Sequence, residues 1–120
     1  AALACLAETK RLNVIENAAA RGTQLFEGCI ALMEKYDIIG DVRGGHGLMT
    51  ALEMVSDHAT KTPIDAGTAQ IVQDVTYEHG AMVRVSGPNL ILSPPLVLTE
   101  NDASIMLSAL DAGFTAATKG

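Results

Sequence analysis

Four short segments with the composition of β-strands, arranged as two pairs, constrain the fold of this chain more than any other feature. The segments are residues 38–43, 48–55, 81–85 and 90–92. A Gly-Pro pair within residues 86–89 predicts a tight turn, and therefore a hairpin, between the last two segments. The glycine-rich residues 44–47 predict a turn or bulge between the first two. Pro94 and Pro95 have no amide hydrogen to donate, so the sheet is expected to end before them.

Helical periodicity surrounds these strands. Helices are expected at residues 2–12, 14–36 and 66–79, and again from Thr99 onward. In the second helix, apolar residues recur every three or four positions and form one stripe. The stripe consists of Ile15, Ala18, Ala19, Leu25, Phe26, Cys29, Leu32 and Met33. Gly22 and Gly28 weaken this helix but allow another element to approach it closely.

The ends of three helices carry recognisable signals. Asn13, with Glu16 three residues later, predicts a side-chain cap at the start of the second helix. Thr99, with Asp102, predicts a similar cap on the last helix. Gly80 predicts the end of the third helix, because glycine readily adopts the left-handed conformation found there.

The order of these segments predicts the fold class, which is α+β. Two helices, two strands, a helix, two strands and a final helix would form a small antiparallel or mixed sheet packed by helices. Residues 1–120 suffice for a single domain, and 48% hydrophobic residues suffice for a core. Residues 56–66 are polar and contain Pro63, so a loop is expected there.

Charge and composition exclude several classes of function. Eight basic and fourteen acidic side chains leave a net charge of −6, which argues against nucleic-acid binding. No apolar run approaches the roughly 20 residues needed to span a bilayer, so no membrane partner is expected and a cytoplasmic location is the default. Cys5 and Cys29 lie in helical apolar patterns, and both are expected to be buried, reduced thiols.

The sequence contains no complete pattern typical of a metal-binding or catalytic site. His46, His58 and His79 are far apart in the sequence, so no metal site is predicted. Residues 44–47 join two strands rather than leading into a helix, which favours a structural turn over a phosphate-binding loop. The sequence also contains no GxSxG nucleophile motif.

Two arginines are the candidates for ligand binding. Arg84 lies in an otherwise apolar strand, where its guanidinium could bind a carboxylate through two parallel hydrogen bonds. An ordinary solvent-facing position is the alternative interpretation. Arg43 flanks the glycine-rich turn and could tie that turn to Asp41 or Glu53, two carboxylates expected on adjacent strands.

Two motifs together resemble a known family. The first reads DVRGGHGLM at residues 41–49, followed by ALEMV at 51–55. The second reads MVR at 82–84, then Gly87, then LILSPPLVLTE at 90–100. Their content and order, with the alanine-rich helix before them, are similar to class III aminotransferases, which are pyridoxal-phosphate enzymes of fold type I. The similarity extends over essentially all 120 residues.

The resemblance implies that residues 1–120 are the C-terminal small domain of a longer enzyme, with residues 1–36 leading from its large domain. In the family, the Schiff-base lysine and the acid that pairs with the pyridine nitrogen belong to the large domain. The phosphate-binding groups come from the large domain and the partner subunit. No catalytic or cofactor-binding residue is therefore expected here, and pyridoxal 5'-phosphate would be bound by the large domain. The lysines of this chain are expected to be surface charges; they are Lys10, Lys35, Lys61 and Lys119.

The same resemblance implies a role for Arg84. Its position matches the arginine that, in ω-amino-acid and amine–pyruvate aminotransferases, binds the substrate carboxylate and swings aside for an uncharged amine. The whole enzyme, a homodimer or homotetramer, would transfer an amino group from an amine or ω-amino acid to pyruvate, and the 120-residue chain alone would be inactive. Two positions depart from the family pattern. The glycine-rich turn is one residue longer, and Gly87-Pro88-Asn89 stands where Gly-Asp is frequent.

Two alternatives remain open. One is another class III aminotransferase, acting on 4-aminobutyrate, ornithine, diaminopelargonate or glutamate semialdehyde. The other is a non-catalytic α+β binding or assembly module. A helical pattern that is already established at Ala1 favours a piece of a longer protein over such a module.

Overall fold

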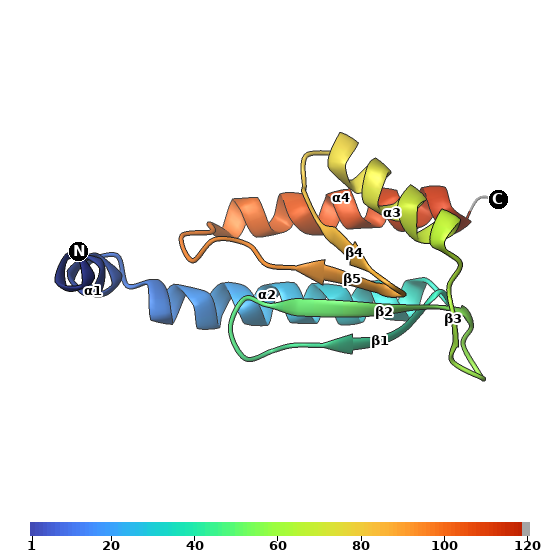
Figure 1. Ribbon diagram of the computed structural model, residues 1–120, viewed down its shortest axis with the longest axis horizontal. Coiled ribbons are helices and arrows are strands. Elements are labelled where there is room, and N and C mark those ends of the chain that lie inside the picture. The colour runs from blue at the N-terminus through green and yellow to red at the C-terminus, as the bar shows by residue number, and fades with distance from the viewer. Residues whose placement is uncertain (119–120) are drawn as a thin grey trace.

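The computed structural model describes residues 1–118 of the chain, which contain four helices and five strands joined by turns and loops (Figure 1). In chain order they are α1 (Ala2–Arg11), α2 (Val14–Lys35), β1 (Ile39–Arg43), β2 (Thr50–Asp57), β3 (Thr62–Pro63), α3 (Ala66–Glu78), β4 (Arg84–Ser86), β5 (Asn89–Leu92) and α4 (Glu100–Thr118). Helices and antiparallel strands are mixed along the chain, which confirms the predicted α+β class.

The strands form an antiparallel sheet in the order β1-β2-β5-β4, with β3 paired to the end of β2. One row across the four main strands consists of Val42, Leu52, Leu90 and Val85. Leu52 and Leu90 are fully buried, so this row lies on the core face of the sheet. Because side chains alternate along a strand, the neighbouring row lies on the opposite face. It consists of Arg43, Ala51, Ile91 and Arg84.

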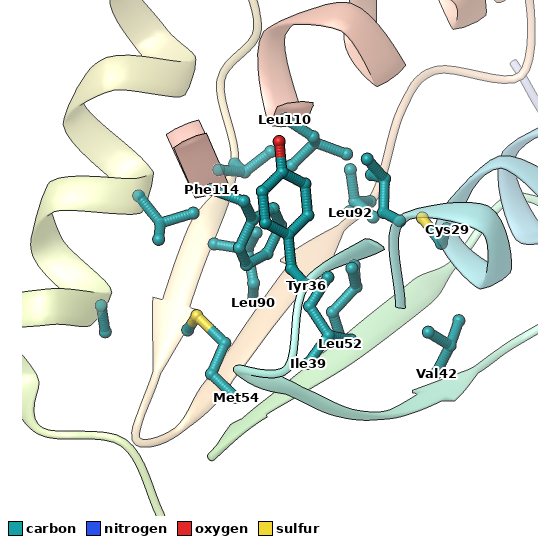
Figure 2. Close-up of a cluster of buried hydrophobic side chains, with 14 residues drawn as sticks. Cys29, Tyr36, Ile39, Val42, Leu52, Met54, Leu90, Leu92, Leu110 and Phe114 are labelled. Carbon is teal, nitrogen blue, oxygen red and sulfur yellow. The ribbon is translucent and has the colours of Figure 1, made fainter. Parts of the chain in front are cut away.

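Helices α2 and α4 cover the core face of the sheet, and α3 packs mainly against α4 (Figure 1). Figure 2 shows the buried cluster, in which Tyr36 and Phe114 pack with their ring centroids 5.7 Å apart. The other residues labelled there are Cys29, Ile39, Val42, Leu52, Met54, Leu90, Leu92 and Leu110. A second, smaller cluster consists of Leu25, Leu48, Leu98 and Ala103. Burial of these apolar side chains is the main force that holds the helices on the sheet.

Helix α1 contributes nothing to this core. None of its residues is buried, and it lies at the N-terminal end of the molecule, away from the sheet (Figure 1). Cys5 on α1 is exposed, so the prediction of a buried thiol is wrong there, because α1 buries no face against the other described residues. The prediction is confirmed for Cys29, where burial raises the pKa of the thiol to about 12.

The apolar stripe of α2 is confirmed over only part of its length. Leu25, Cys29 and Leu32 are buried. Ile15 is 75% exposed and Ala19 is also exposed, so the prediction is wrong for these two residues. The reason is that the first turns of α2 extend beyond the sheet (Figure 1).

Two of the three predicted helix ends are confirmed. The Asp102 N–H donates to Thr99 Oγ1 at 3.0 Å, and the Thr99 N–H donates to Asp102 Oδ2 at 3.4 Å. Gly80 has a φ of +105° just past the end of α3. At Asn13 the prediction of a side-chain cap is wrong. This residue adopts a left-handed backbone, with φ +54°, to join α1 to α2, and its side chain makes no capping hydrogen bond.

Some strand boundaries differ from the predicted ones. β2 starts at Thr50 and β4 at Arg84, each later than expected. Residues 56–66 are not entirely a loop, because Ser56 and Asp57 complete β2 and Thr62–Pro63 form β3, so the prediction is wrong at these four residues. β3 pairs antiparallel with the end of β2, with Pro63 opposite Val55. A proline is tolerated in a strand at the edge of a sheet, because its missing N–H interrupts no hydrogen bonds between strands there.

Candidate functional site

Arg84 is the first residue of β4, the strand at one edge of the sheet. Its side chain is exposed, and within residues 1–118 it forms no ion pair. Its neighbour across the sheet is Ile91 of β5, on the face opposite the core. The guanidinium of Arg84 therefore has no ion-pair partner among the described residues, and the backbone of Arg84 is held in the sheet.

Arg84 lines a groove of about 830 Å³ between α3 and the β4–β5 hairpin. Ile91 lines the same groove from β5, and α3 contributes Asp74, Tyr77 and Glu78. Asp74 and Glu78 are one helical turn apart, so they lie on the same side of α3. The groove thus combines a cation on the strand side with two carboxylates on the helix side, and its volume is within the range of small-molecule sites.

Gln73 connects α3 to β4 at this groove. Its side-chain oxygen accepts a hydrogen bond from the backbone N–H of Val85 at 3.0 Å, and the residue also lines the groove. Nothing in the sequence singles out Gln73. The bond depends on how a helix packs beside a strand, and no local pattern marks such a partner.

Arg43, at the opposite edge of the sheet, is paired. Its Nη1 donates to Glu53 Oε2 at 2.8 Å and to Asp41 Oδ2 at 3.3 Å, and its Nη2 donates to Asn89 Oδ1 at 2.9 Å. The hydrogen bond with Glu53 is the main reason that the pKa of Arg43 is raised. The structure confirms that Arg43 binds Asp41 and Glu53, and it shows that the side-chain oxygen of Asn89 accepts from Arg43.

The glycine-rich residues 44–47 form a turn between β1 and β2, as predicted. Gly45 and Gly47 have φ angles of +89° and +93°, which other residues rarely adopt. Gly22 of α2 packs directly against the backbone of Gly47. The turn therefore has a structural explanation in its backbone conformation and its contact with α2.

The three described lysines have separate surroundings. Lys35 donates to Asp111 at 2.8 Å, and Lys61 donates to the carbonyl oxygen of Gly40 at 2.6 Å. Lys10 is exposed on α1, where it lines a pocket. The prediction that these three lysines are surface residues agrees with their exposure, and Lys119, the fourth, lies outside the described residues.

Within residues 1–118, no group of three or more His, Cys, Asp or Glu side chains is arranged to hold a metal ion. None of the helices in the same part is both long and apolar enough to cross a bilayer.

Comparison with known proteins identifies the family. The family model described as Aminotransferase class-III matches residues 1–113. The chain belongs to the class III aminotransferases. It is 37% identical to the taurine–pyruvate aminotransferase of Bilophila wadsworthia, over 96% of this chain and 26% of that relative. It is 41% identical to the mitochondrial alanine–glyoxylate aminotransferase 2 homolog 2 of Arabidopsis thaliana, over 92% of this chain and 24% of the relative.

A solved transaminase structure supports the same assignment. The amine transaminase from an uncultivated Pseudomonas species, in its PLP-bound form, matches with a TM-score of 0.89 and 44% identity, over 95% of this chain and 26% of that one. The family expected from the motifs at residues 41–55 and 82–100 is therefore confirmed. The chain spans about a quarter of the length of the relatives that it matches.

Proposed function

We propose that residues 1–120 are the C-terminal small domain of an aminotransferase that uses pyridoxal phosphate to move an amino group from an amine or ω-amino acid to pyruvate. Membership of the class III aminotransferases supports the reaction class. The names of two similar proteins, a taurine–pyruvate aminotransferase and an amine transaminase, support the substrate classes. The chain spans about a quarter of each, which supports its assignment as one domain of a larger enzyme.

In this proposal, the cofactor and the catalytic lysine are supplied from outside residues 1–118. The chain by itself is inactive, because its described lysines are exposed or engaged elsewhere. The whole enzyme is a homodimer or homotetramer, and its cytoplasmic location stays a prediction from the sequence.

Arg84 is the substrate-binding residue that this chain contributes. An aminotransferase accepts an amine donor and a keto-acid acceptor in turn at one site. A guanidinium can bind the carboxylate of the keto acid through two parallel charge-assisted hydrogen bonds. Because Arg84 has no ion-pair partner within residues 1–118, its long side chain is free to turn away from a donor that carries no carboxylate.

The reaction class is tested on the full-length enzyme by its absorption spectrum. A visible band of bound pyridoxal phosphate is expected to shift when an amine donor is added and to return when pyruvate is added. A protein that takes up no pyridoxal phosphate would contradict the proposal and would favour a non-catalytic binding or assembly module.

The role of Arg84 is tested with Arg84→Ala in the same enzyme. The kcat/KM for pyruvate is expected to fall by the equivalent of about 1.5–3 kcal/mol, the contribution of a hydrogen bond to a charged group. The kcat/KM for an alkyl amine without a carboxylate is expected to stay near the wild-type value. Arg43→Ala is the matched control, because it removes a paired arginine from the same row of the sheet. Equal losses for pyruvate and the amine in Arg84→Ala would mean that Arg84 is a structural residue.

A further inference from the structure

Strand β4 is an edge strand with a helix beside it. It pairs only with β5 within the sheet order β1-β2-β5-β4, so backbone groups on its outer side have no strand partner. The Val85 N–H is one of these groups, and it donates to the side-chain oxygen of Gln73 at 3.0 Å. Gln73 on α3 thus supplies the hydrogen-bond acceptor that a neighbouring strand would otherwise provide for Val85, the residue next to Arg84.

Helix α3 is a firm support for this contact. Ala69, Val72 and Thr76 on α3 are fully buried. A Cβ at Gly113 of α4 would overlap the side chain of Thr76, which shows how closely the two helices pack. Such a close-packed helix pair resists displacement. The position of Gln73 is therefore set by the core and not by the groove.

We propose that Gln73 is a positioning residue for substrate selection: by holding the Val85 N–H it fixes β4, and with it Arg84, at a set distance from α3. The inference rests on the proposed function of Arg84 and extends it. A bidentate contact with a carboxylate depends on the placement of both guanidinium nitrogens. A strand released from α3 would leave Arg84 charged and present but poorly placed, so binding of a keto acid would weaken while binding of an uncharged amine would not.

The test compares three variants of the full-length enzyme. Gln73→Leu removes the acceptor and keeps a side chain of similar size, and Gln73→Glu keeps an oxygen acceptor. Gln70→Leu is the matched control, because Gln70 lies on the same helix and donates to Asp74 at 2.7 Å rather than to β4. For each variant, amide hydrogen exchange of the peptide that contains Val85 is measured, together with KM and kcat for pyruvate and for an alkyl amine.

Gln73→Leu is expected to speed exchange at Val85 and to raise KM for pyruvate about 3- to 10-fold, the ratio that corresponds to one neutral hydrogen bond. The kinetic constants for the amine are expected to stay near wild type, and the melting temperature is expected to fall only slightly, because a single neutral hydrogen bond is lost. Gln73→Glu is expected to keep slow exchange at Val85, because its oxygen can still accept the hydrogen bond. Its added carboxylate lies in the groove of Arg84, so its KM for pyruvate does not serve as a control. Gln70→Leu is expected to behave as wild type in both assays.

Three results would overturn the inference, and they are distinguishable from one another. Unchanged KM for pyruvate in Gln73→Leu, with a selective loss in Arg84→Ala, would reject the role of Gln73 and leave the proposed function intact. Equal losses for both substrates in Gln73→Leu would mean that Gln73 is a general structural residue. No selective loss in Arg84→Ala would reject the proposed role of Arg84 and this inference with it.

Discussion

Arg43 on β1 extends past β2 to Asn89 on β5, where its Nη2 donates to the side-chain oxygen of Asn89 at 2.9 Å. The same guanidinium also binds Glu53 on β2 at 2.8 Å, so one side chain links three strands on the face opposite the core. Asn89 belongs to the Gly87-Pro88-Asn89 segment that joins β4 to β5. Its side chain binds Arg43, whereas Arg84 has no ion-pair partner within residues 1–118.

Replacing Arg43 with Met is expected to lower the free energy of unfolding by up to about 1 kcal/mol, because half-exposed ion pairs are weakened by solvent. Asp41 and Glu53 are direct neighbours across β1 and β2, so the variant also leaves two like charges opposite each other. Urea unfolding at low salt and at about 1 M salt measures the effect, and salt is expected to remove most of it. Arg43→Lys keeps the charge and should lose less stability. A loss that is equal at both salt concentrations would contradict an electrostatic origin.

Gly22 and Gly28 lie on the same helix but face different neighbours. A Cβ at Gly22 would overlap the backbone carbonyl of Gly47, whereas a Cβ at Gly28 would meet the end of the Leu107 side chain. A backbone carbonyl cannot rotate away as a side chain can. Gly22→Ala is therefore expected to lower the free energy of unfolding by about 1–3 kcal/mol, and Gly28→Ala by less. Both variants gain similar helix propensity, so thermal unfolding of the pair isolates the steric effect. Equal losses in the two variants would contradict it.

Acid is expected to weaken the contact between the end of α2 and α4. Lys35 and Tyr36 bind Asp111 Oδ1 at 2.8 and 2.6 Å. These hydrogen bonds, from Lys35 first and then Tyr36, hold the pKa of the Asp111 carboxyl below its ordinary value of 3.8. The unfolded state, with the ordinary pKa, takes up its proton first as the pH falls. The stabilisation is therefore complete above the ordinary pKa and is lost as the pH falls through the lowered pKa of the folded state.

Asp111→Asn tests this expectation. Wild type is expected to exceed the variant in free energy of unfolding at about pH 7. The difference is expected to disappear as the pH falls through the lowered pKa of Asp111, because both side chains are neutral below it. Urea unfolding at a series of pH values measures it. A difference that stays constant across this range would mean that shape, and not charge, makes the contact.

Local structure follows closely from the sequence where neighbours in the chain determine it. The reciprocal cap of Thr99 and Asp102 and the left-handed Gly80 are examples, because each depends on groups within a few residues. The failures at Asn13 and Ile15 have the opposite cause. Asn13 adopts the backbone needed to join two helices, and Ile15 is exposed because α2 extends beyond the sheet.

The pairing of the two arginines could not be predicted in this way. Arg43 and Arg84 are both strand arginines, and they lie in the same row at opposite edges of the sheet. Register places Glu53 and Asn89 beside the first, while α3 leaves an open groove beside the second. Helices, strands, caps and family motifs are encoded over short distances along the chain, so the residues alone sufficed for them. The partners of Arg43, the freedom of Arg84 and the bond from Val85 to Gln73 depend on how distant segments pack, and only the folded chain brings those segments together.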